Sequence, residues 1–364
     1  MLETELTRAL HIRYPIIQAP MAGGPTTADL VAAVSNAGGL GSLGAGYLTP
    51  EQIRLAIQEI RARTDRPFAV NLFVPEQPTE SEAAIAEMTA YLNVYREALG
   101  IPSNPLIPSF SESFEEQVRV LLEERIPVLS FTFGIPPQEV IQAMKDQGSF
   151  VIGTATTVDE AIRLEAAGVD AVVAQGSEAG GHRGTFLKDA SGSLIGAMAL
   201  VPQMADHVSL PVIASGGIMD GRGLVASLAL GAAAVQMGTA FLACTESGAH
   251  PAYKQKILSE NEDATEITRA YSGKAARGIR TDFMRDMQQY SGTIPDYPIQ
   301  NAMTRDIRQA AAKANRPEYM SLWAGQGLRL ASSRSAAAII RQTVDQANAL
   351  AQRLTGLGTS GHLK

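Results

Sequence analysis

The chain has 364 residues, of which 45% are hydrophobic and 18% are charged, and its net charge is −7. This balance is typical of a globular protein, and the acidic charge argues against non-specific nucleic-acid binding. A single cysteine, Cys244, excludes an intramolecular disulfide and cysteine-based metal sites. The N-terminal segment "MLETELTRAL" is charged and has no apolar core, so we expect no signal peptide and a cytoplasmic protein.

Eight short apolar runs alternate with stretches typical of helices. In chain order the runs cover residues 15–20, 40–45, 68–74, 127–133, 150–155, 171–176, 211–217 and 234–239. The clearest helical stretches between them are 50–63, 137–147 and 157–167. This alternation predicts an α/β fold, a TIM-like (β/α)8 barrel, which we expect to occupy residues 1–245.

Two segments depart from a minimal barrel. Residues 75–113 are too long for one connection and are predicted to form an inserted helix followed by a proline-rich loop. Residues 246–364 are predicted to be a mainly helical extension that forms a small domain over the active site.

Residues 223–245 contain no charged side chain and approach the length of a membrane span. Gly231 and Gln236 interrupt this segment, however. A helix over 224–230, a glycine stop and a buried strand explain it better, because buried elements of α/β proteins are apolar on all sides. We therefore expect no membrane partner.

Catalytic residues of such barrels lie where the strands end, on the loops that follow them. Small and polar residues occupy these positions, where packing alone would favour apolar ones. They are Gln18–Met21, Asn71, Thr132, Thr154, Gln175, Ser215–Gly217 and Gln236–Thr239.

Glycine-rich segments follow the last two predicted strands. They are "ASGGIMDGRG" (214–223) and "QMGTAF" (236–241). Barrels commonly bind phosphate there through backbone N–H groups, to which Thr239 can add a hydroxyl. Tight turns without a ligand are the alternative. A phosphorylated cofactor such as FMN fits, with its phosphate at Gly217 and Gly238 and its ring against Pro20, Met21, Asn71 and Gln175.

The segment "GLGSLG" (39–44) matches the glycine spacing of a dinucleotide fingerprint. That fingerprint requires a strand before it and a helix opening on it. Here a helix precedes the motif, and the motif itself occupies a strand. We interpret it as an inner strand whose glycines leave room for packing.

His182 lies in "QGSEAGGHRG" (175–184), just after a predicted strand and between glycines. A loop with so little bulk lets a ligand ring pack on the backbone while one imidazole reaches over it. Histidine suits proton transfer near neutral pH, and the charge of Arg183 would keep it neutral and basic. A structural histidine is the alternative. Only Glu178 lies nearby as an acid, so no metal site is predicted.

The segment 175–184 resembles the signature of the nitronate monooxygenases, formerly called 2-nitropropane dioxygenases. Similar motifs of that family are "QAPMAGG" (18–24), "NLFVP" (71–75), "SGGIMDGRG" (215–223), "GAAAVQMGTAFL" (231–242) and "YSGKAARGI" (271–279). The resemblance extends from about residue 10 to "LWAGQG" (322–327).

This resemblance implies a TIM-like barrel with non-covalent FMN and with His182 as the catalytic base. It also implies oxidation of alkyl nitronates, such as propionate 3-nitronate, by O2 to carbonyl compounds and nitrite or related nitrogen oxides. Asn71, Gln175, Gly180, Gly217, Gln236, Met237, Gly238 and Thr239 match flavin-binding positions of the family. With their neighbours at the strand ends and in the glycine loops, Pro20, Met21, Gly181, Ser215 and Gly216, they are the candidate flavin-binding residues.

An anionic substrate needs positive charge nearby. Arg183, Lys274 and Arg277 are the candidates, with Tyr271 in the same glycine-containing segment. An ordinary basic surface loop is the alternative interpretation of 271–280.

Three rival functions share the scaffold or the cofactor. They are a flavin-dependent enoyl-acyl carrier protein reductase, an NAD(P)H:quinone reductase and a non-enzymatic flavin-binding protein. The sequence leaves the preferred nitronate, any use of NAD(P)H and the oligomeric state open.

Overall fold

The computed structural model describes residues 2–76, 78, 81–107 and 109–359. Eight parallel strands form one sheet in the order β1-β9-β8-β6-β5-β4-β3-β2. They are β1 (Ile16–Gln18), β2 (Gly41–Gly44), β3 (Phe68–Phe73), β4 (Val128–Thr132), β5 (Phe150–Ala155), β6 (Ala171–Gln175), β8 (Val212–Ser215) and β9 (Ala234–Met237). Each lies within one of the eight predicted runs, and the (β/α)8 barrel is confirmed.

The first and second strands close the barrel. A single bridge joins Ile17 to Leu40, and the Leu40 N–H donates to the Ile16 carbonyl at 2.9 Å. The fully buried Gln18 side chain extends this seam, because its amide donates to the Ser42 carbonyl at 3.1 Å and accepts from the Ser42 N–H at 3.0 Å. Gln18, a strand-end residue expected at the site, is therefore occupied in closing the barrel.

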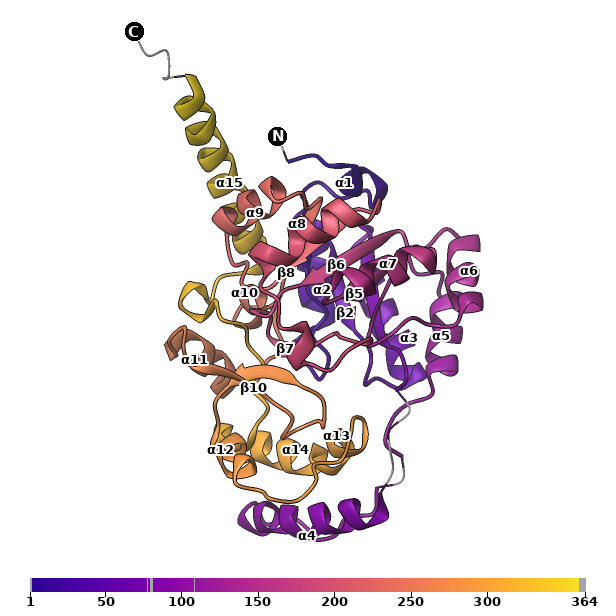
Figure 1. Cartoon of the computed structure of the whole chain (residues 1–364), viewed down its shortest axis with the longest axis vertical. Helices are drawn as coiled ribbons and strands as arrows, with labels where there is room; N and C mark the ends of the chain where they lie inside the picture. Colours follow the sequence, from indigo (N-terminus) through magenta and orange to yellow (C-terminus); the bar gives the residue numbers. More distant parts are fainter. Residues whose placement is uncertain (1, 77, 79–80, 108, 360–364) are drawn as a thin grey trace.

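Helices surround the strands (Figure 1). They are α1 (Glu5–Ala9), α2 (Ala28–Asn36), α3 (Pro50–Arg61), α5 (Phe114–Glu123), α6 (Gln138–Asp146), α7 (Val158–Ala166), α8 (Ala197–His207), α9 (Gly221–Ala229) and α10 (Thr239–Leu242). The predicted helices 50–63, 137–147 and 157–167 correspond to α3, α6 and α7. The start of α3 carries two sequence signals of a helix N-terminus. Thr49 and Gln52 form a capping box, and Pro50 lies in the first turn.

The two ambiguous segments of the sequence are also settled. Residues 39–44 end in β2, as expected, and a side chain at Gly41 would collide with the Val31 carbonyl of α2. The glycine thus lets α2 approach the strand. Residues 223–245 fall on α9, β9 and α10, and within the described part of the chain no helix is long and apolar enough to cross a membrane.

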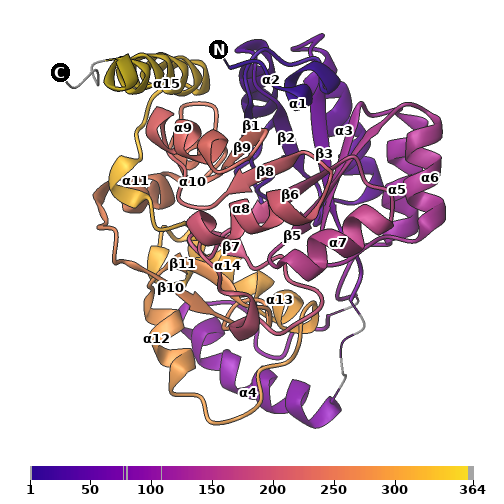
Figure 2. The same cartoon turned by 45° about the horizontal axis from the view of Figure 1, so that its top comes forward.

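A second apolar core lies beyond the barrel. The inserted helix α4 (Glu82–Ala98) contributes Met88 and Leu92, and they cluster with Phe283, Met303 and Ile307 from the C-terminal part of the chain. The helices of that part include α11 (Pro251–Ser259), α12 (Asp282–Gln288), α13 (Ile299–Met303) and α14 (Arg305–Lys313), with short 3-10 turns at Pro317–Tyr319 and Leu328–Leu330. A third 3-10 turn, Ser191–Ser193, lies in the barrel part. Figures 1 and 2 show α4 at the end of the molecule, against α12 and α13.

A small antiparallel sheet joins the two parts. It has the order β10-β11-β7, with β10 (Thr265–Thr268) and β11 (Ala276–Ile279) from the extension and β7 (Gly181–His182) from the loop after β6. His182 pairs with Ala276, and Gly181 pairs with Arg277. The extension is therefore helical with one added hairpin, and this hairpin holds the histidine loop.

The last helix, α15 (Ala336–Thr359), returns to the barrel and packs between α9 and α2. Ile340, Val344 and Ala347 are buried there, and a side chain at Gly221 would collide with the backbone of Ala347. Figure 2 shows α15 beside α9 and away from α12–α14. The chain after residue 245 thus contributes to both parts of the molecule, and the division at that residue stays a prediction.

Candidate active site

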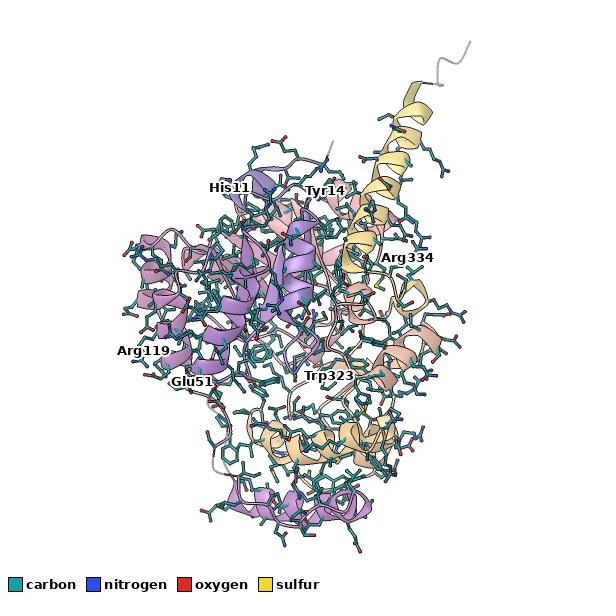
Figure 3. The ribbon with its side chains drawn as sticks, turned by 180° about the vertical axis from the view of Figure 1, so that it is seen from behind. His11, Tyr14, Glu51, Arg119, Trp323 and Arg334 are labelled. Carbon is teal, nitrogen blue, oxygen red and sulfur yellow. The ribbon has the colours of Figure 1, made fainter. Side chains whose placement is uncertain are left out.

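One cavity of about 770 Å³ lies at the carboxyl ends of the barrel strands. Side chains from six different strand ends line it, as the sequence predicted: Asn71, Thr132, Thr154, Gln175, Ser215 and Gln236. Segments of the extension line the facing side. Trp323 marks this side in Figure 3, where it lies between the barrel and the helices of the extension.

The floor near β8 and β9 is made of backbone. Gly216 and Gly217 line the cavity in left-handed conformations, with φ of +116° and +68°. Among the described residues, the N–H groups of Gly217, Gly238 and Thr239 donate no backbone hydrogen bond. The Thr239 hydroxyl accepts from the Gly325 N–H at 2.9 Å, so a tail residue completes this cradle. Such a set of free N–H groups suits an anion.

The predicted cofactor residues converge on this cavity with one exception. Those that line it are Pro20, Met21, Asn71, Gln175, Gly180, Gly181, Ser215, Gly216, Gly217, Gln236, Gly238 and Thr239. Met237 is 1% exposed and packs against the surrounding helices instead. Strand alternation explains this, because successive side chains of β9 point to opposite faces.

Gln175 fixes the loop that carries the histidine. Its amide nitrogen donates to the His182 carbonyl at 3.1 Å, and its oxygen accepts from the Gly184 N–H at 2.9 Å. Glu160 holds the next residues, because its buried carboxylate accepts from Thr185 Oγ1 and from the N–H groups of Phe186 and Leu187. Burial alone would raise the pKa of Glu160, but these hydrogen bonds outweigh it and the pKa is lowered.

Gly180 is the point where the barrel loop and the tail touch. A Cβ atom at this position would lie 2.5 Å from the carbonyl carbon of Ala324 and from the Gly325 nitrogen. Only glycine permits this approach. Gly180 therefore serves the contact between loop and tail as well as the cavity wall.

His182 lies among aromatic rings at the top of the cavity. Its ring centroid is 5.4 Å from that of Trp323, 5.7 Å from Phe133 and 6.0 Å from Tyr297. Burial lowers the pKa of His182 to about 3, and the charges of Lys274 and Arg308 act in the same direction. The imidazole is therefore neutral at neutral pH, and burial with Lys274 and Arg308, rather than the charge of Arg183 that the sequence suggested, is the cause.

Ser272 contacts the imidazole directly, with its Oγ 2.8 Å from His182 Nε2 and 3.1 Å from the Lys274 carbonyl. The hydroxyl has only one hydrogen to give. When it donates to the carbonyl, Nε2 must carry the imidazole hydrogen, which leaves Nδ1 as the basic atom.

Arg183 points away from the cavity. Its guanidinium donates to Gln175 Oε1 at 3.0 Å, to the Gly176 carbonyl at 2.8 Å and to the Ser193 carbonyl at 2.6 Å. Burial lowers its pKa to about 10, so it keeps its charge at neutral pH. Its geometry is that of a residue that secures the loop.

The other three predicted substrate contacts are also absent from the described cavity lining. Tyr271 is buried, and its hydroxyl bonds to Thr281 and to the Met320 carbonyl. Lys274 pairs with Glu76 at 2.5 Å, and Arg277 donates to the Ser177 carbonyl at 3.0 Å. The geometry gives none of these residues a direct route to a ligand in the cavity.

Other residues take their place at the wall. Tyr47, Phe133, Arg305, Arg308 and Trp323 line the cavity, and sequence reasoning missed them as site residues. Phe133 and Tyr47 each follow a strand end closely, which was an available signal. Phe133 also adopts a φ of +78°, an outlier for a bulky side chain and a sign of strain of the kind found at functional sites.

The described residues include no group of three or more His, Cys, Asp or Glu side chains arranged to hold a metal ion. A barrel whose strand-end cavity combines an anion cradle with a half-buried, neutral histidine has the features of an enzyme that binds a phosphorylated cofactor or substrate. The comparisons with known proteins identify the family. The family model "Nitronate monooxygenase" matches residues 3–346, and the chain belongs to that family of oxidoreductases.

Curated relatives support this placement. A "Probable nitronate monooxygenase" from Staphylococcus haemolyticus is 49% identical over 348 residues, which cover 95% of this chain and 97% of the relative. A protein of the same description from Staphylococcus aureus is 48% identical over 351 residues, covering 96% and 99%.

Solved structures agree. A nitroalkane oxidase from Streptomyces ansochromogenes is 38% identical and superposes with a TM-score of 0.89, over 96% of this chain and 99% of that one. FabK from Thermotoga maritima is 33% identical with a TM-score of 0.78, over 98% and 100%.

Proposed function

We propose that this enzyme uses non-covalent FMN and O2 to oxidise alkyl nitronates, among them propionate 3-nitronate. The expected products are a carbonyl compound and nitrite or related nitrogen oxides. One observation carries the proposal: the backbone cradle at Gly217, Gly238 and Thr239 and the neutral His182 line the same cavity. The cradle suits a phosphate, and the histidine suits work on a weakly acidic carbon–hydrogen bond.

The residues present fit FMN. The free N–H groups of Gly217, Gly238 and Thr239 would hold its phosphate, and Pro20 and Met21 would pack against its ring. The Asn71 amide donates to Ser130 Oγ at 3.0 Å, which leaves its carbonyl oxygen for a ring N–H. When bound, the flavin accepts the electrons that the nitronate gives up.

His182 acts on the substrate before that electron transfer. A neutral nitroalkane must lose its α-proton, and the basic imidazole nitrogen can take it. Gln175, Ser272 and the β7–β11 pairing hold the ring in place. A preformed nitronate has already lost this proton, so it does not need the base.

The test is oxygen uptake by the purified protein with propionate 3-nitronate, ethyl nitronate and nitroethane. We expect uptake with both nitronates, together with FMN in the supernatant after denaturation. A protein that consumes no O2 with any of these substrates, or that releases FAD, would contradict the proposal.

A second candidate is reduction by NAD(P)H, as in an enoyl-acyl carrier protein reductase or a quinone reductase. The similarity to FabK keeps reductive chemistry under consideration, although its TM-score is lower than that of the nitroalkane oxidase. NADH oxidation measured in parallel decides between them. Steady NADH oxidation without nitronate turnover would favour a reductase.

A further inference from the structure

Helix α14 presents two arginines to the cavity. Arg308 is anchored by the preceding helix α13 and by the N-cap residue of α14, since it donates to the Asn301 carbonyl at 2.7 Å, to Asn301 Oδ1 at 2.9 Å and to the Thr304 carbonyl at 3.3 Å. Arg305 lies one turn earlier, is exposed and lines the same cavity. Among the described residues, neither guanidinium has a carboxylate within 4.0 Å.

The charged groups near these arginines are already paired with each other or with other residues. Lys274 pairs with Glu76, and the carboxylate next in sequence to Arg305, that of Asp306, pairs with the buried Arg96 at 2.8 Å. The two α14 arginines are thus left without a counter-charge where they face the cavity. Glu112 is the one carboxylate among the described lining residues, against these two guanidinium groups.

A hydroxyl completes this wall. The Tyr47 side-chain oxygen is buried and has no hydrogen-bond partner among the described residues. Burial raises the pKa of Tyr47, whereas the charge of Arg308, the neighbouring Tyr297 hydroxyl and the charge of Arg305 oppose that rise. Tyr47 and both arginines line the same cavity. A protonated phenol beside a guanidinium can donate to the same anion.

Aromatic side chains border the arginines. Tyr47 packs on Phe73 with ring centroids 5.2 Å apart, and Phe73 packs on Phe133 at 4.7 Å. Phe133 in turn contacts His182, so an apolar surface leads from the Tyr47 end of the cavity to the imidazole. Such a surface suits the body of a ligand whose charged end reaches the guanidinium groups.

We propose that Arg305, Arg308 and the Tyr47 hydroxyl form an anion-binding subsite for the carboxylate of an amphipathic substrate. In this arrangement the apolar body of the substrate lies on the aromatic wall and its reactive carbon faces His182. The inference rests on the proposed function only for the part of the substrate that faces His182, and not for its carboxylate. The carboxylate subsite replaces Lys274 and Arg277 as the source of charge selectivity.

Binding of an unreactive acid tests the subsite without turnover. The probes are 3-phenylpropionate and 3-phenylpropanol, which share a body and differ in charge, titrated calorimetrically into the flavin-loaded enzyme. We expect the acid to bind at least about tenfold more tightly than the alcohol, as befits a partly desolvated charge pair. Arg308→Met should abolish this preference, and Arg305→Met and Tyr47→Phe should each reduce it.

A conservative variant and a control variant accompany this test. Arg308→Lys retains the charge and should keep part of the preference if Arg308→Met fails to fold. Arg285→Met removes an exposed arginine on α12 that pairs with Asp282, and it should leave both affinities unchanged. Equal affinity of the wild type for acid and alcohol would overturn the proposal, and so would loss of the preference in Lys274→Met but not in Arg308→Met.

Turnover separates this proposal from the proposed function. Arg308→Met should lower kcat/KM for a carboxylated nitronate by about tenfold or more and leave that for ethyl nitronate within about twofold. If the wild type oxidises no nitronate but still prefers the acid in calorimetry, the proposed function fails and the subsite stands. If it oxidises both nitronates and shows no preference in calorimetry, the subsite fails and the proposed function stands.

Discussion

The two walls of the cavity are built in different ways. The barrel wall is made of strand ends and glycine backbone, and Gly216, Gly217 and Gly238 offer N–H groups and no bulk. The extension wall is made of large side chains, with Trp323, Arg305 and Arg308 facing inward. Backbone geometry recognises a group that is the same in every turnover, whereas large side chains recognise the shape and charge of a substrate.

His182 belongs to both walls. The loop after β6 brings it in, and β11 of the extension holds it as a β7 residue. Under the proposed function, the reacting carbon would therefore lie where the cofactor and the substrate meet. Substitutions can therefore affect one wall, the other, or the residue that joins them.

Replacement of His182 should have the largest effect. His182→Asn keeps a polar side chain but cannot take a proton near neutral pH. General-base catalysis typically contributes about 10²–10⁴-fold, so we expect turnover of nitroethane to fall by that factor. Oxidation of preformed ethyl nitronate should stay within about tenfold of wild type, as measured by oxygen uptake.

Flavin content must be compared first, because Gly181 next to His182 has a φ of +76° and the loop lines the cavity. An equal fall for both substrates with the flavin retained would show that His182 does not act as a base.

An ion pair between α4 and α14 supports the extension wall. Arg96 on α4 is fully buried, and its guanidinium donates to Asp306 on α14 at 2.8 Å and to the Met303 carbonyl at 2.7 Å. Asp306→Asn leaves that charge buried without its partner. Breaking such a pair costs about 3 kcal/mol of the free energy of unfolding, measured by urea titration.

The same variant should weaken the carboxylate preference more than flavin binding, since α14 carries the arginines and the barrel carries the cradle. Asp282→Asn is the matched control, because its partner Arg285 is exposed and such a pair contributes less than about 1 kcal/mol. A loss of flavin equal to the loss of acid binding would mean that the two walls do not act separately.

Replacement of Gly217 should affect the barrel wall alone. Gly217 has a φ of +68°, and Gly148, at the end of α6, has a φ of +88° with open space where a Cβ atom would lie. Alanine at either site should cost about 1–2 kcal/mol of stability, because a side chain disfavours the left-handed conformation. Only Gly217→Ala should also lower FMN retention, by about tenfold, as measured after gel filtration. Equal retention in both variants would remove Gly217 from the phosphate cradle.

The sequence predicted the barrel wall far better than the extension wall, for a physical reason. Asn71 and Gln175 lie at the ends of strands that recur along the sequence and can be recognised from it. A parallel barrel brings the carboxyl ends of all its strands to one face. Arg305 and Arg308 are ordinary residues of an amphipathic helix, and tertiary packing of α14, through Ile307 on one side and Ala311 on another, turns them toward the cavity. Lys274 and Arg277 had the right charge, but their partners Glu76 and Ser177 lie 198 and 100 residues away in the chain.

The smallest expected effect is a dependence of stability on pH. His182 has its pKa lowered to about 3 in the folded protein, mainly by burial, whereas a histidine in the unfolded chain titrates near 6.5. Between these values the unfolded state binds a proton that the folded state does not. The free energy of unfolding therefore falls as the pH is lowered from about 6.5, by up to about 1.4 kcal/mol per pH unit, and is unaffected by His182 above that range.

His182→Asn isolates this contribution, because asparagine does not titrate. Urea unfolding at pH 7.0 and pH 5.5 should give wild type a larger loss of stability than the variant, by roughly 1 kcal/mol. The other four histidines and the carboxylates remain in both proteins, so their contributions cancel in the difference. A wild type and a variant that lose the same free energy would mean that His182 protonates as readily in the fold as in the unfolded chain. The aromatic rings of Trp323, Phe133 and Tyr297 would then not shield the imidazole from water, and the neutral base at the junction of the two walls would have to be abandoned.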